Sequence, residues 1–224
     1  MMVDRIVWSE VPNYSYAEAA RYLRMPETTV RYWAKGGSVT RPTGDGRFHK
    51  VLTDAPASKL TFANLTELLI VRELRTAFNV PLGAIRRAQL YASEVLGKPL
   101  YLHELHTHGR DVFISDLATN LVAASRYGEV ALSGFFDGML ARVELDPEYR
   151  PEAIFPDVPG SSTQKPVQIS PTISFGAPTI TGTGIQTSFV AYRINNGESV
   201  EEVAQDYGLQ IDQIKDAYRF QLVA

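Results

Sequence analysis

Residues 14–35 read YSYAEAARYLRMPETTVRYWAK and carry the strongest structural signal in this chain. Ser15 with Glu18 three residues later is the pattern of a capping box, which predicts that a helix begins there. Pro26 cannot continue that helix, but it can open the next one, where its missing N–H is no loss. The stretch is therefore predicted to form two short helices joined by a tight turn.

The second of these helices is expected over residues 27–35, with one apolar side and one polar side. Val30 and Trp33, three positions apart, are predicted to face inward. The outward positions hold hydroxyl, aromatic and cationic side chains that suit phosphates and base edges: Thr28, Thr29, Arg31, Tyr32 and Lys35. The two helices are thus predicted to be a helix-turn-helix whose second helix enters a DNA groove.

Basic residues are concentrated around this unit. Residues 21–50 contain seven Lys and Arg residues against two acidic residues, a local net charge of +5. The sequence Gly44-Asp45-Gly46 is a turn signal, so a β-hairpin wing is predicted around it. Contacts with DNA phosphates are expected from the basic residues of this segment, which are Arg41, Arg47 and Lys50.

The pattern A-E-A-A-R-Y-L, then T-V-R-Y-W, then a basic hairpin that contains glycine, resembles the MerR-like winged helix-turn-helix over about the first third of the chain. The resemblance implies a DNA-binding regulator. We assign residues 1–97 to this domain, with predicted helices at 60–75 and 80–96 that brace it. The Arg-Tyr pair that usually follows the wing is replaced here by Phe48-His49. The alternative is an ordinary helical hairpin with a solvated basic face.

Composition and charge set the broad class of the protein. Its 224 residues are 45 % hydrophobic and can bury a substantial core in two domains, and the absence of cysteine excludes disulfides, thiol catalysis and cysteine zinc sites. No apolar run reaches membrane-spanning length, so a cytoplasmic protein without membrane contact is expected. The net charge is +4 over residues 1–111 and −7 over residues 112–224. The acidic half is expected to bind protein, because its carboxylates oppose binding to phosphates.

Residues 98–146 are predicted to connect the two halves through a β-hairpin at 101–115 and a helix at 130–145. The hairpin contains three of the four histidines, which are His103, His106 and His108. No metal site is predicted, because His103 and His106 would lie on opposite faces of a strand.

A proline-rich stretch follows at residues 147–171. Its six prolines predict a semi-extended linker without helix or sheet. Ile154 and Phe155 are unusual in a free linker, so they are expected to dock either on their own domain or on a partner.

Residues 172–224 are predicted to form a compact C-terminal unit. A short strand with a glycine turn at 178–185 precedes three helices, of which the first stops at Gly197 and the second at Gly208. The predicted fold class is therefore mainly α with small β elements, in which an N-terminal winged helix-turn-helix is followed by a C-terminal tri-helical bundle.

This C-terminal sequence, ISFGAPTITGTGIQTSFVAYRINNGESVEEVAQDYGLQIDQIKDAYRF, closely resembles the domain of unknown function numbered 433. The shared pattern is P-x-I-x-G-T-x-I, a helix, then G-E-S-x-E-E-(I/V)-A-x-D-Y-G-L and a third helix with a Q-I-x-x-A core. Behind a winged helix-turn-helix, such a domain is similar to the antitoxin of a type II toxin–antitoxin module of the VapB-like kind. The resemblance implies operator DNA and a PIN-like ribonuclease toxin as partners. Gly184 departs from the family, which often has Arg or Lys there.

Two partner surfaces are expected on this basis. A homodimer, which would place two winged units on a two-fold operator, is expected to form through Phe189, Tyr192, Ile194 and Tyr218. The alternative is that these side chains form the core of their own domain.

The toxin surface is expected to combine a cation with an aromatic anchor, because the resemblance implies a toxin with metal-binding carboxylates. The expected toxin-binding residues are Arg150 and Phe155, together with Ile154 and Arg142. The alternative for Arg150 is a surface ion pair with Glu148 or Glu152, which would contribute little.

Enzymatic motifs are weak in this sequence. Gly182-Thr183-Gly184 lacks the third glycine of a dinucleotide loop, and no lysine follows as in a P-loop. Glu201 and Glu202 are adjacent on a helix and diverge, so shared acid–base catalysis is not expected. We expect no enzyme activity, no cofactor and no metal. Two other functions stay open: a stand-alone MerR-like regulator that responds to a small molecule, and a protein-interaction module whose helix-turn-helix is only a scaffold.

Overall fold

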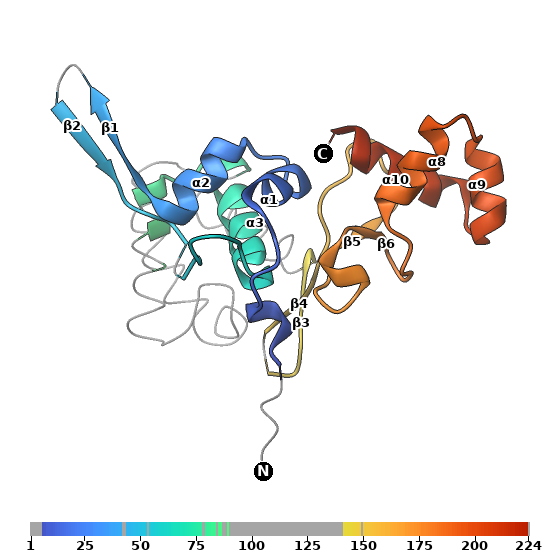
Figure 1. Ribbon diagram of the computed structural model, residues 1–224, viewed down its shortest axis with the longest axis horizontal. Coiled ribbons are helices and arrows are strands. Elements are labelled where there is room, and N and C mark those ends of the chain that lie inside the picture. The colour runs from blue at the N-terminus through green and yellow to red at the C-terminus, as the bar shows by residue number, and fades with distance from the viewer. Residues whose placement is uncertain are drawn as a thin grey trace, which may run out of the picture.

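The computed structural model describes residues 6–41, 44–52, 54–77, 79–83, 85–86, 89, 141–148 and 150–223. These residues form mainly helices, together with three small two-stranded sheets, so the predicted fold class is confirmed. Figure 1 shows the N-terminal helices and a projecting hairpin at one end of the longest axis, and the C-terminal helices at the other.

Helices α1 (Tyr16–Tyr22) and α2 (Glu27–Lys35) form the predicted helix-turn-helix. The Ser15 hydroxyl accepts a hydrogen bond from the backbone N–H of Glu18, whose carboxylate accepts from the backbone N–H of Ser15, so the predicted capping box is present. Pro26 stands at the N-cap of α2, one position before the first helical residue. The start and end of α2 agree with the range expected from the sequence.

Helix α3 (Phe62–Thr76) is the buried centre of the N-terminal unit, and Thr61 and Asn64 form a second capping box at its start. Its fully buried side chains repeat at helical spacing and include Leu65, Leu68, Val71 and Leu74. Val30 and Trp33 of α2 belong to the same core, so the inward face of α2 was predicted correctly. The helix expected at 80–96 lies mostly outside the described residues. The hairpin expected at 101–115, with its three histidines, lies outside them entirely.

Strands β1 (Gly37–Arg41) and β2 (Gly44–Phe48) pair antiparallel and form the predicted wing. Arg41 pairs with Gly44, so the Gly-Asp-Gly sequence lies inside β2 and not at the turn, where it was predicted. Gly36, at φ 69°, ends α2 and leads the chain directly into β1. Figure 1 shows this hairpin projecting from the end of α2.

Residues 143–145 correct the prediction of a helix over 130–145, of which residues 130–140 lie outside the described part. Val143–Leu145 is strand β3, which pairs antiparallel with β4 (Pro151–Ile154). The turn between them is closed by Asp146, whose Oδ1 accepts hydrogen bonds from the backbone N–H groups of Glu148 and Arg150. An Asp that bonds the backbone two residues ahead favours a turn over a helix, which is the physical reason for the error.

The linker predicted at 147–171 is also wrong, because this segment is built into the fold. Pro151 is the first residue of β4, a position where a strand tolerates a proline and its missing N–H. Farther on, the N–H of Ile154 donates to the carbonyl of Ile169, and the N–H of Phe155 donates to the carbonyl of Arg142, both at 2.9 Å. Ile154 and Phe155 are buried, so they dock on their own chain, which was the first of the two alternatives.

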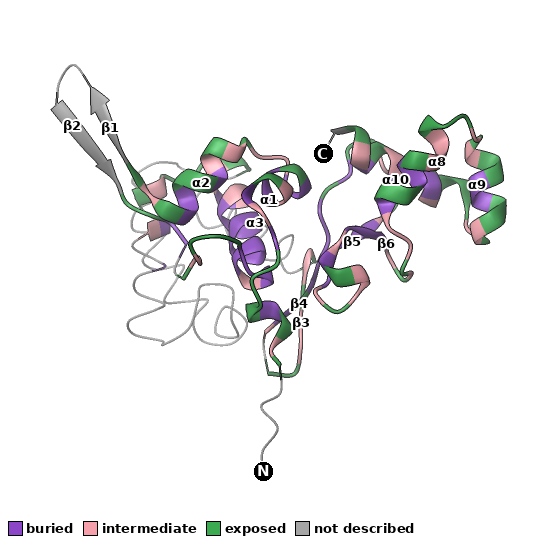
Figure 2. Ribbon diagram, viewed as in Figure 1, coloured by how far each residue is buried: buried purple, intermediate pink, exposed green. Residues whose placement is uncertain are grey.

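The C-terminal unit is a three-helix bundle on a small sheet, as predicted. Strands β5 (Val167–Gln168) and β6 (Thr179–Ile180) pair and are followed by α8 (Thr187–Asn195), α9 (Val200–Tyr207) and α10 (Ile211–Val223). The bundle has its own core, which contains Ile180, Val190, Val203, Ala204, Ile214 and Ala217. Figure 2 shows buried positions on the inward sides of these helices and exposed positions on their outer sides.

The two units touch through side chains and backbone. Ile154 and Ile169 form a β-bridge and both belong to the N-terminal core. Next to them, Asn13 Nδ2 donates a hydrogen bond of 2.7 Å to the carbonyl of Phe175 in the short helix η2 (Ser174–Gly176). The C-terminal unit is therefore fastened to the segment that precedes α1.

Candidate nucleic-acid interface

The outer face of α2 has the composition that the sequence predicted. Thr28, Arg31, Tyr32 and Lys35 are exposed, and Thr29 is half-buried. These side chains can offer positive charge and hydrogen-bond donors to phosphates and base edges. Helix α2 leads into the projecting β1–β2 hairpin (Figure 1), so the candidate helix and the candidate wing are adjacent.

Tyr16 of α1 organises the cations of this face, a role that sequence reasoning missed. The Arg31 guanidinium lies 5.0 Å from the centre of the Tyr16 ring, and Lys35 Nζ lies 4.8 Å from it. Both distances are within cation–π range, where each contact contributes about 0.5–1 kcal/mol at an exposed site. Burial raises the pKa of the Tyr16 phenol, so the ring stays neutral. Its hydroxyl donates to the carbonyl of Pro56 at 3.3 Å, which orients the ring.

Arg31 also pairs with Glu27, four residues earlier on α2, at 2.5 Å between Nη2 and Oε1. Exposed i,i+4 pairs are worth only about 0.3–0.5 kcal/mol. A hydrogen bond from the guanidinium to a base or phosphate is worth more than that, so DNA can displace Glu27 from Arg31. The pair therefore holds Arg31 extended along the helix without removing it from the candidate interface.

The remaining predicted DNA contacts lie on the wing and just after it. Arg41 is the last residue of β1, and Arg47 lies in β2 opposite Ser38. Lys50 is exposed and lies just beyond the wing. The backbone N–H groups of the next two residues, Val51 and Leu52, both donate to the carbonyl of Trp33 in α2. The backbone thus places all three basic residues on or next to the hairpin that extends from α2.

Arg24 is part of the basic cluster in the sequence but does not serve the interface. It adopts φ 51° in the turn between α1 and α2, and its guanidinium lies 5.8 Å from the centre of the Phe220 ring in α10. Its Nε and Nη2 atoms are buried without hydrogen-bond partners. Burial lowers the pKa of Arg24, an effect that Asp157 opposes and Arg72 reinforces. Arg24 faces the C-terminal unit. The cations of the N-terminal unit with α1, α2, the wing and α3, which we call the head, are therefore not equivalent.

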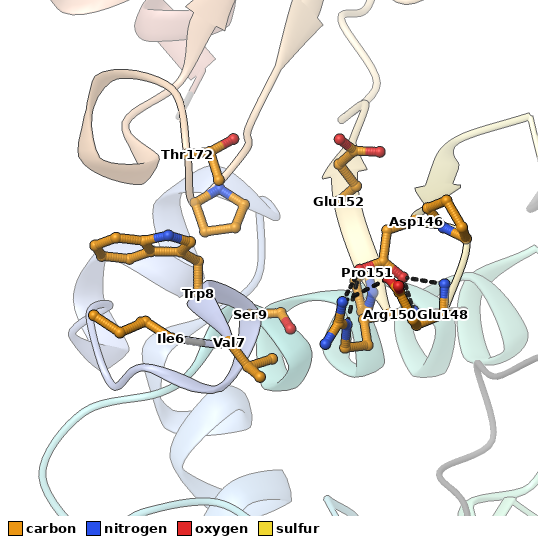
Figure 3. Close-up of a pocket in the computed structure, with 12 residues that line it drawn as sticks. Ile6, Val7, Trp8, Ser9, Asp146, Glu148, Arg150, Pro151, Glu152 and Thr172 are labelled. Carbon is orange, nitrogen blue, oxygen red and sulfur yellow. Dashed lines mark hydrogen bonds and ion pairs between the residues drawn. The ribbon is translucent and has the colours of Figure 1, made fainter. Parts of the chain in front are cut away.

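The predicted toxin-binding residues are engaged within the chain. Arg150 forms ion pairs of 2.7 Å with Asp146 and with Glu148, so the alternative of a local pair holds, with Asp146 as an additional partner. Hydrogen bonds from Arg150 and from the Glu148 backbone lower the pKa of Asp146, although partial burial raises it. Figure 3 shows these groups across from Trp8 at a cavity of about 250 Å³.

The other residues of that set are no more available. Ile154 and Phe155 are buried, and Lys165 Nζ covers the Phe155 ring at 4.2 Å from its centre. Arg142 is shared between Asp157 at 3.3 Å and Glu73 at 3.8 Å. In this conformation, Phe155 cannot act as an anchor for a partner, which corrects the expectation of an exposed linker.

The predicted dimerisation residues divide into two groups. Phe189 and Tyr192 are exposed on α8. Ile194 packs against the core of the bundle, and the Tyr218 hydroxyl donates to Asn195 Oδ1 at 2.9 Å. Phe189 and Tyr192 are available to a second molecule. Ile194 and Tyr218 contribute to their own domain, which is the alternative given in the sequence analysis.

Comparisons with known proteins agree with both predicted domains. Residues 12–89 match the family model described as "Putative DNA-binding HTH domain". Residues 167–220 match the model described as "Protein of unknown function (DUF433)". The helix-turn-helix and the C-terminal domain of the sequence analysis are therefore confirmed. Among the described residues, no helix is long and apolar enough to cross a membrane.

Similar proteins extend over nearly the whole chain. The "Putative antitoxin VapB45" of Mycobacterium tuberculosis is 25% identical over 228 residues, which cover 93% of each protein. The "Uncharacterized protein Rv2308" of the same organism is 28% identical over 226 residues, covering 96% of this chain and 90% of that protein. The crystal structure of Rv2018 from Mycobacterium tuberculosis matches with a TM-score of 0.66 and 23% identity, covering 92% of this chain and 97% of the other. The whole arrangement thus follows a known fold.

Proposed function

We propose that this protein is a homodimeric, VapB-like antitoxin that represses its own operon through a MerR-like winged helix-turn-helix and neutralises a PIN-like ribonuclease toxin. The observation that carries the proposal is the outer face of α2, where Arg31 and Lys35 are exposed and held over the Tyr16 ring. The proposal gives the chain itself no catalytic role and no cofactor.

The charge distribution supports DNA binding by the first half alone. Neutralising phosphates releases counterions, which drives association, and this needs a basic surface without competing carboxylates. The basic excess of residues 21–50 meets that need, whereas the second half has a net charge of −7. Repression follows if the wing and α2 occupy DNA that the transcription machinery needs.

The antitoxin role is supported by the relative of that name, which is similar over 93% of both chains. The buried state of Phe155 moves the proposed anchor for the toxin to another aromatic residue. Phe175 is 91% exposed, and both Ser174 (φ 47°) and Phe175 (φ 56°) adopt left-handed backbone conformations. Such residues cost about 1–3 kcal/mol each and concentrate at functional sites.

Phe175 is held outward by hydrogen bonds on both sides. Asn13 Nδ2 donates to its carbonyl at 2.7 Å, and Ser174 Oγ donates to the carbonyl of Gly184 at 2.8 Å. Folding stability alone gives no reason to present a large apolar side chain on a strained turn. We therefore propose Phe175 as the aromatic anchor for the toxin, in place of Phe155.

Operator binding is tested by fluorescence anisotropy with the DNA upstream of the protein's own coding sequence, at two salt concentrations. We expect Arg31→Ala to weaken binding. The matched control is Lys165→Ala, which removes a cation of the second half that pairs with Glu144 at 2.8 Å. Equal affinity of wild type, Arg31→Ala and Lys165→Ala would reject the α2 interface.

Toxin neutralisation is tested by co-expression with the product of the adjacent reading frame. Phe175→Ala should restore growth arrest and abolish co-purification, whereas Trp8→Ala, which truncates an exposed aromatic elsewhere, should do neither. A protein that binds its operator but neither contacts nor neutralises that product would leave the stand-alone MerR-like regulator as the better proposal.

A further inference from the structure

Exposed hydrophobic side chains gather on two helices of the C-terminal bundle. Tyr192 is 68% exposed and Phe189 57% on α8, while Leu222 is 63% and Ile211 40% on α10. These are four of the nine large hydrophobic residues that are exposed in the described part of the chain. Contiguous apolar surface on a soluble protein marks sites of interaction.

Helices α8 and α10, which carry these side chains, lie side by side in the bundle. The two helices pack on each other and are locked at their sides by two hydrogen bonds, from Gln221 Nε2 to Thr187 Oγ1 at 2.7 Å and from the Tyr218 hydroxyl to Asn195 Oδ1 at 2.9 Å. On α10, Ile211 and Leu222 lie eleven positions apart, which is three helical turns and hence the same side. We call the exposed hydrophobic side chains of these two helices, which are Phe189, Tyr192, Ile211 and Leu222, the α8–α10 face.

The cations of α8 and α10 each have an acidic partner within the bundle, so the α8–α10 face is close to neutral. The charged residue of α8, Arg193, turns away to Glu198 and to Asp206, the latter at 2.5 Å. On α10, Lys215 lies 4.0 Å from Asp212, and Arg219 pairs with Asp216 at 2.9 Å. The outer side of α9 differs, because Glu201 and Glu202 are exposed there.

Charge decides which partner suits the face. In a two-fold dimer each patch meets a copy of itself, so a patch with one sign of charge repels its copy and a neutral patch does not. The acidic side of α9 is thus unsuited to self-association, whereas the α8–α10 face meets the requirement. We propose that a second copy of this chain binds through the α8–α10 face, with Tyr192 and Phe189 as its aromatic anchors.

The size of the face fits this partner. With about 150–250 Å² for an aromatic side chain, the exposed parts of the four hydrophobic residues amount to roughly 400–500 Å² per copy. Polar neighbours such as Ser188 and Asn195 would extend the contact toward the roughly 800 Å² per partner of a standard interface. The inference gives the proposed homodimer its surface and rests on that part of the proposed function.

This interface also determines where the DNA-reading heads lie. Figure 1 shows the wing and α2 at the opposite end of the longest axis from α8 and α9. Two copies joined at their C-terminal units therefore hold their heads far apart. We expect half-sites separated by more than one helical turn of DNA, at a multiple of about 10–10.5 base pairs.

The test is sedimentation equilibrium of the full chain over a concentration series. Wild type should be dimeric at micromolar concentration, and Tyr192→Lys should raise the dimer dissociation constant by at least about 30-fold, because it truncates an anchor and sets like charges against each other. Leu222→Lys provides a second variant on α10. The control, Phe175→Lys, changes an even more exposed aromatic outside the face and should leave the dimer intact while abolishing neutralisation of the toxin.

The outcomes separate the parts of the proposal. Dimers as tight as wild type for both Tyr192→Lys and Leu222→Lys overturn the α8–α10 face, and loss of the dimer in Phe175→Lys moves the interface to η2. A wild type that stays monomeric overturns the homodimer. In that case anisotropy on a single half-site still reports on DNA binding, so failure of the dimer is distinguished from failure of the DNA-binding proposal.

Discussion

The DNA-binding head and the C-terminal bundle are both small helical units with capped helices, yet they use arginine in opposite ways. In the head, Arg31 lies along α2 with one exposed acidic neighbour and with the Tyr16 ring behind it. In the bundle, Arg193 is held by both Glu198 and Asp206 and lies against the Tyr207 ring. One arginine is available to an external anion, whereas the other is neutralised inside its own domain.

The difference teaches that the number of cations is a poor guide to a nucleic-acid interface. Whether a cation is available to a nucleic acid depends on how many carboxylates lie next to it. Arg24 extends the point, because it belongs to the head but its guanidinium lies against the Phe220 ring of the bundle, with Nε and Nη2 buried. The head and the bundle are therefore not independent modules. The contact between the head and the bundle can be tested separately from DNA binding and from toxin neutralisation.

The largest effect is expected at the contact between the two units. At Gly176 (φ +80°), an added Cβ would lie 2.2 Å from the Tyr14 hydroxyl oxygen, so Gly176→Ala must displace η2 from the segment before α1. We expect a loss of about 3 kcal/mol or more in unfolding free energy, measured by denaturant titration. Gly182→Ala is the control, because Gly182 has a similar φ (+77°) but no atom within 4 Å of the added Cβ. Equal losses would mean that backbone strain alone, and not the contact, is responsible.

A smaller effect is expected when cations of the head are compared with one another. Arg31→Ala and Lys35→Ala should each weaken operator binding by about 1–3 kcal/mol, because each removes a donor from the outer face of α2. Arg24→Asn removes the same charge from a half-buried site that faces the bundle and keeps a residue that tolerates φ 51°, so it should leave affinity nearly unchanged. Anisotropy at constant salt gives the comparison. A loss at Arg24→Asn as large as at Arg31→Ala would mean that overall charge, and not position, determines binding.

The bundle should respond to acid through its internal arginine. Hydrogen bonds from Arg193 hold the pKa of Glu198 below its ordinary value of 4.5. A carboxylate with a lowered folded pKa stabilises the protein fully above its unfolded pKa, and this contribution is lost as the pH falls through the folded pKa. Thermal melts from about pH 6 down to about pH 3 should therefore show a smaller decline for Glu198→Gln than for wild type. Glu201→Gln, on the exposed side of α9, should decline as wild type does.

Local features of the fold were predictable from the sequence because they depend on neighbouring residues. The capping box of Ser15 and Glu18 and the glycine stop at Gly208 fix helix ends with contacts a few positions apart. The outer face of α2 followed from the inward spacing of Val30 and Trp33 alone. The helix ends and the exposure of this face were confirmed, whereas its contacts with DNA stay a prediction.

Contacts between distant segments were not predictable in this way. Ile154 is buried because it forms a β-bridge with Ile169, and no spacing of apolar residues within 147–171 predicts that bridge. The stack of Arg31 and Lys35 on Tyr16 depends on the angle at which α1 meets α2. The presence of Ile154 and Phe155 in a proline-rich segment was a usable signal, because such side chains would be costly to leave in water. That signal indicated docking, but not the surface that receives it.

The smallest effect is expected at Arg150, which was the cation first assigned to the toxin. Both of its acidic partners, Asp146 and Glu148, lie within its own turn, so a toxin carboxylate would have to compete with two local ones. Exposed ion pairs contribute little to stability, and the backbone N–H of Arg150 would still bond Asp146 after the guanidinium is removed. Arg150→Gln should therefore change the melting temperature only slightly and leave neutralisation of the co-expressed toxin intact, in contrast to Phe175→Ala. Growth arrest that is restored with Arg150→Gln, but not with Arg150→Lys, would place the inhibitory site at the β3–β4 turn. In that case, Arg150 would have to break its ion pair with Asp146 when the toxin binds.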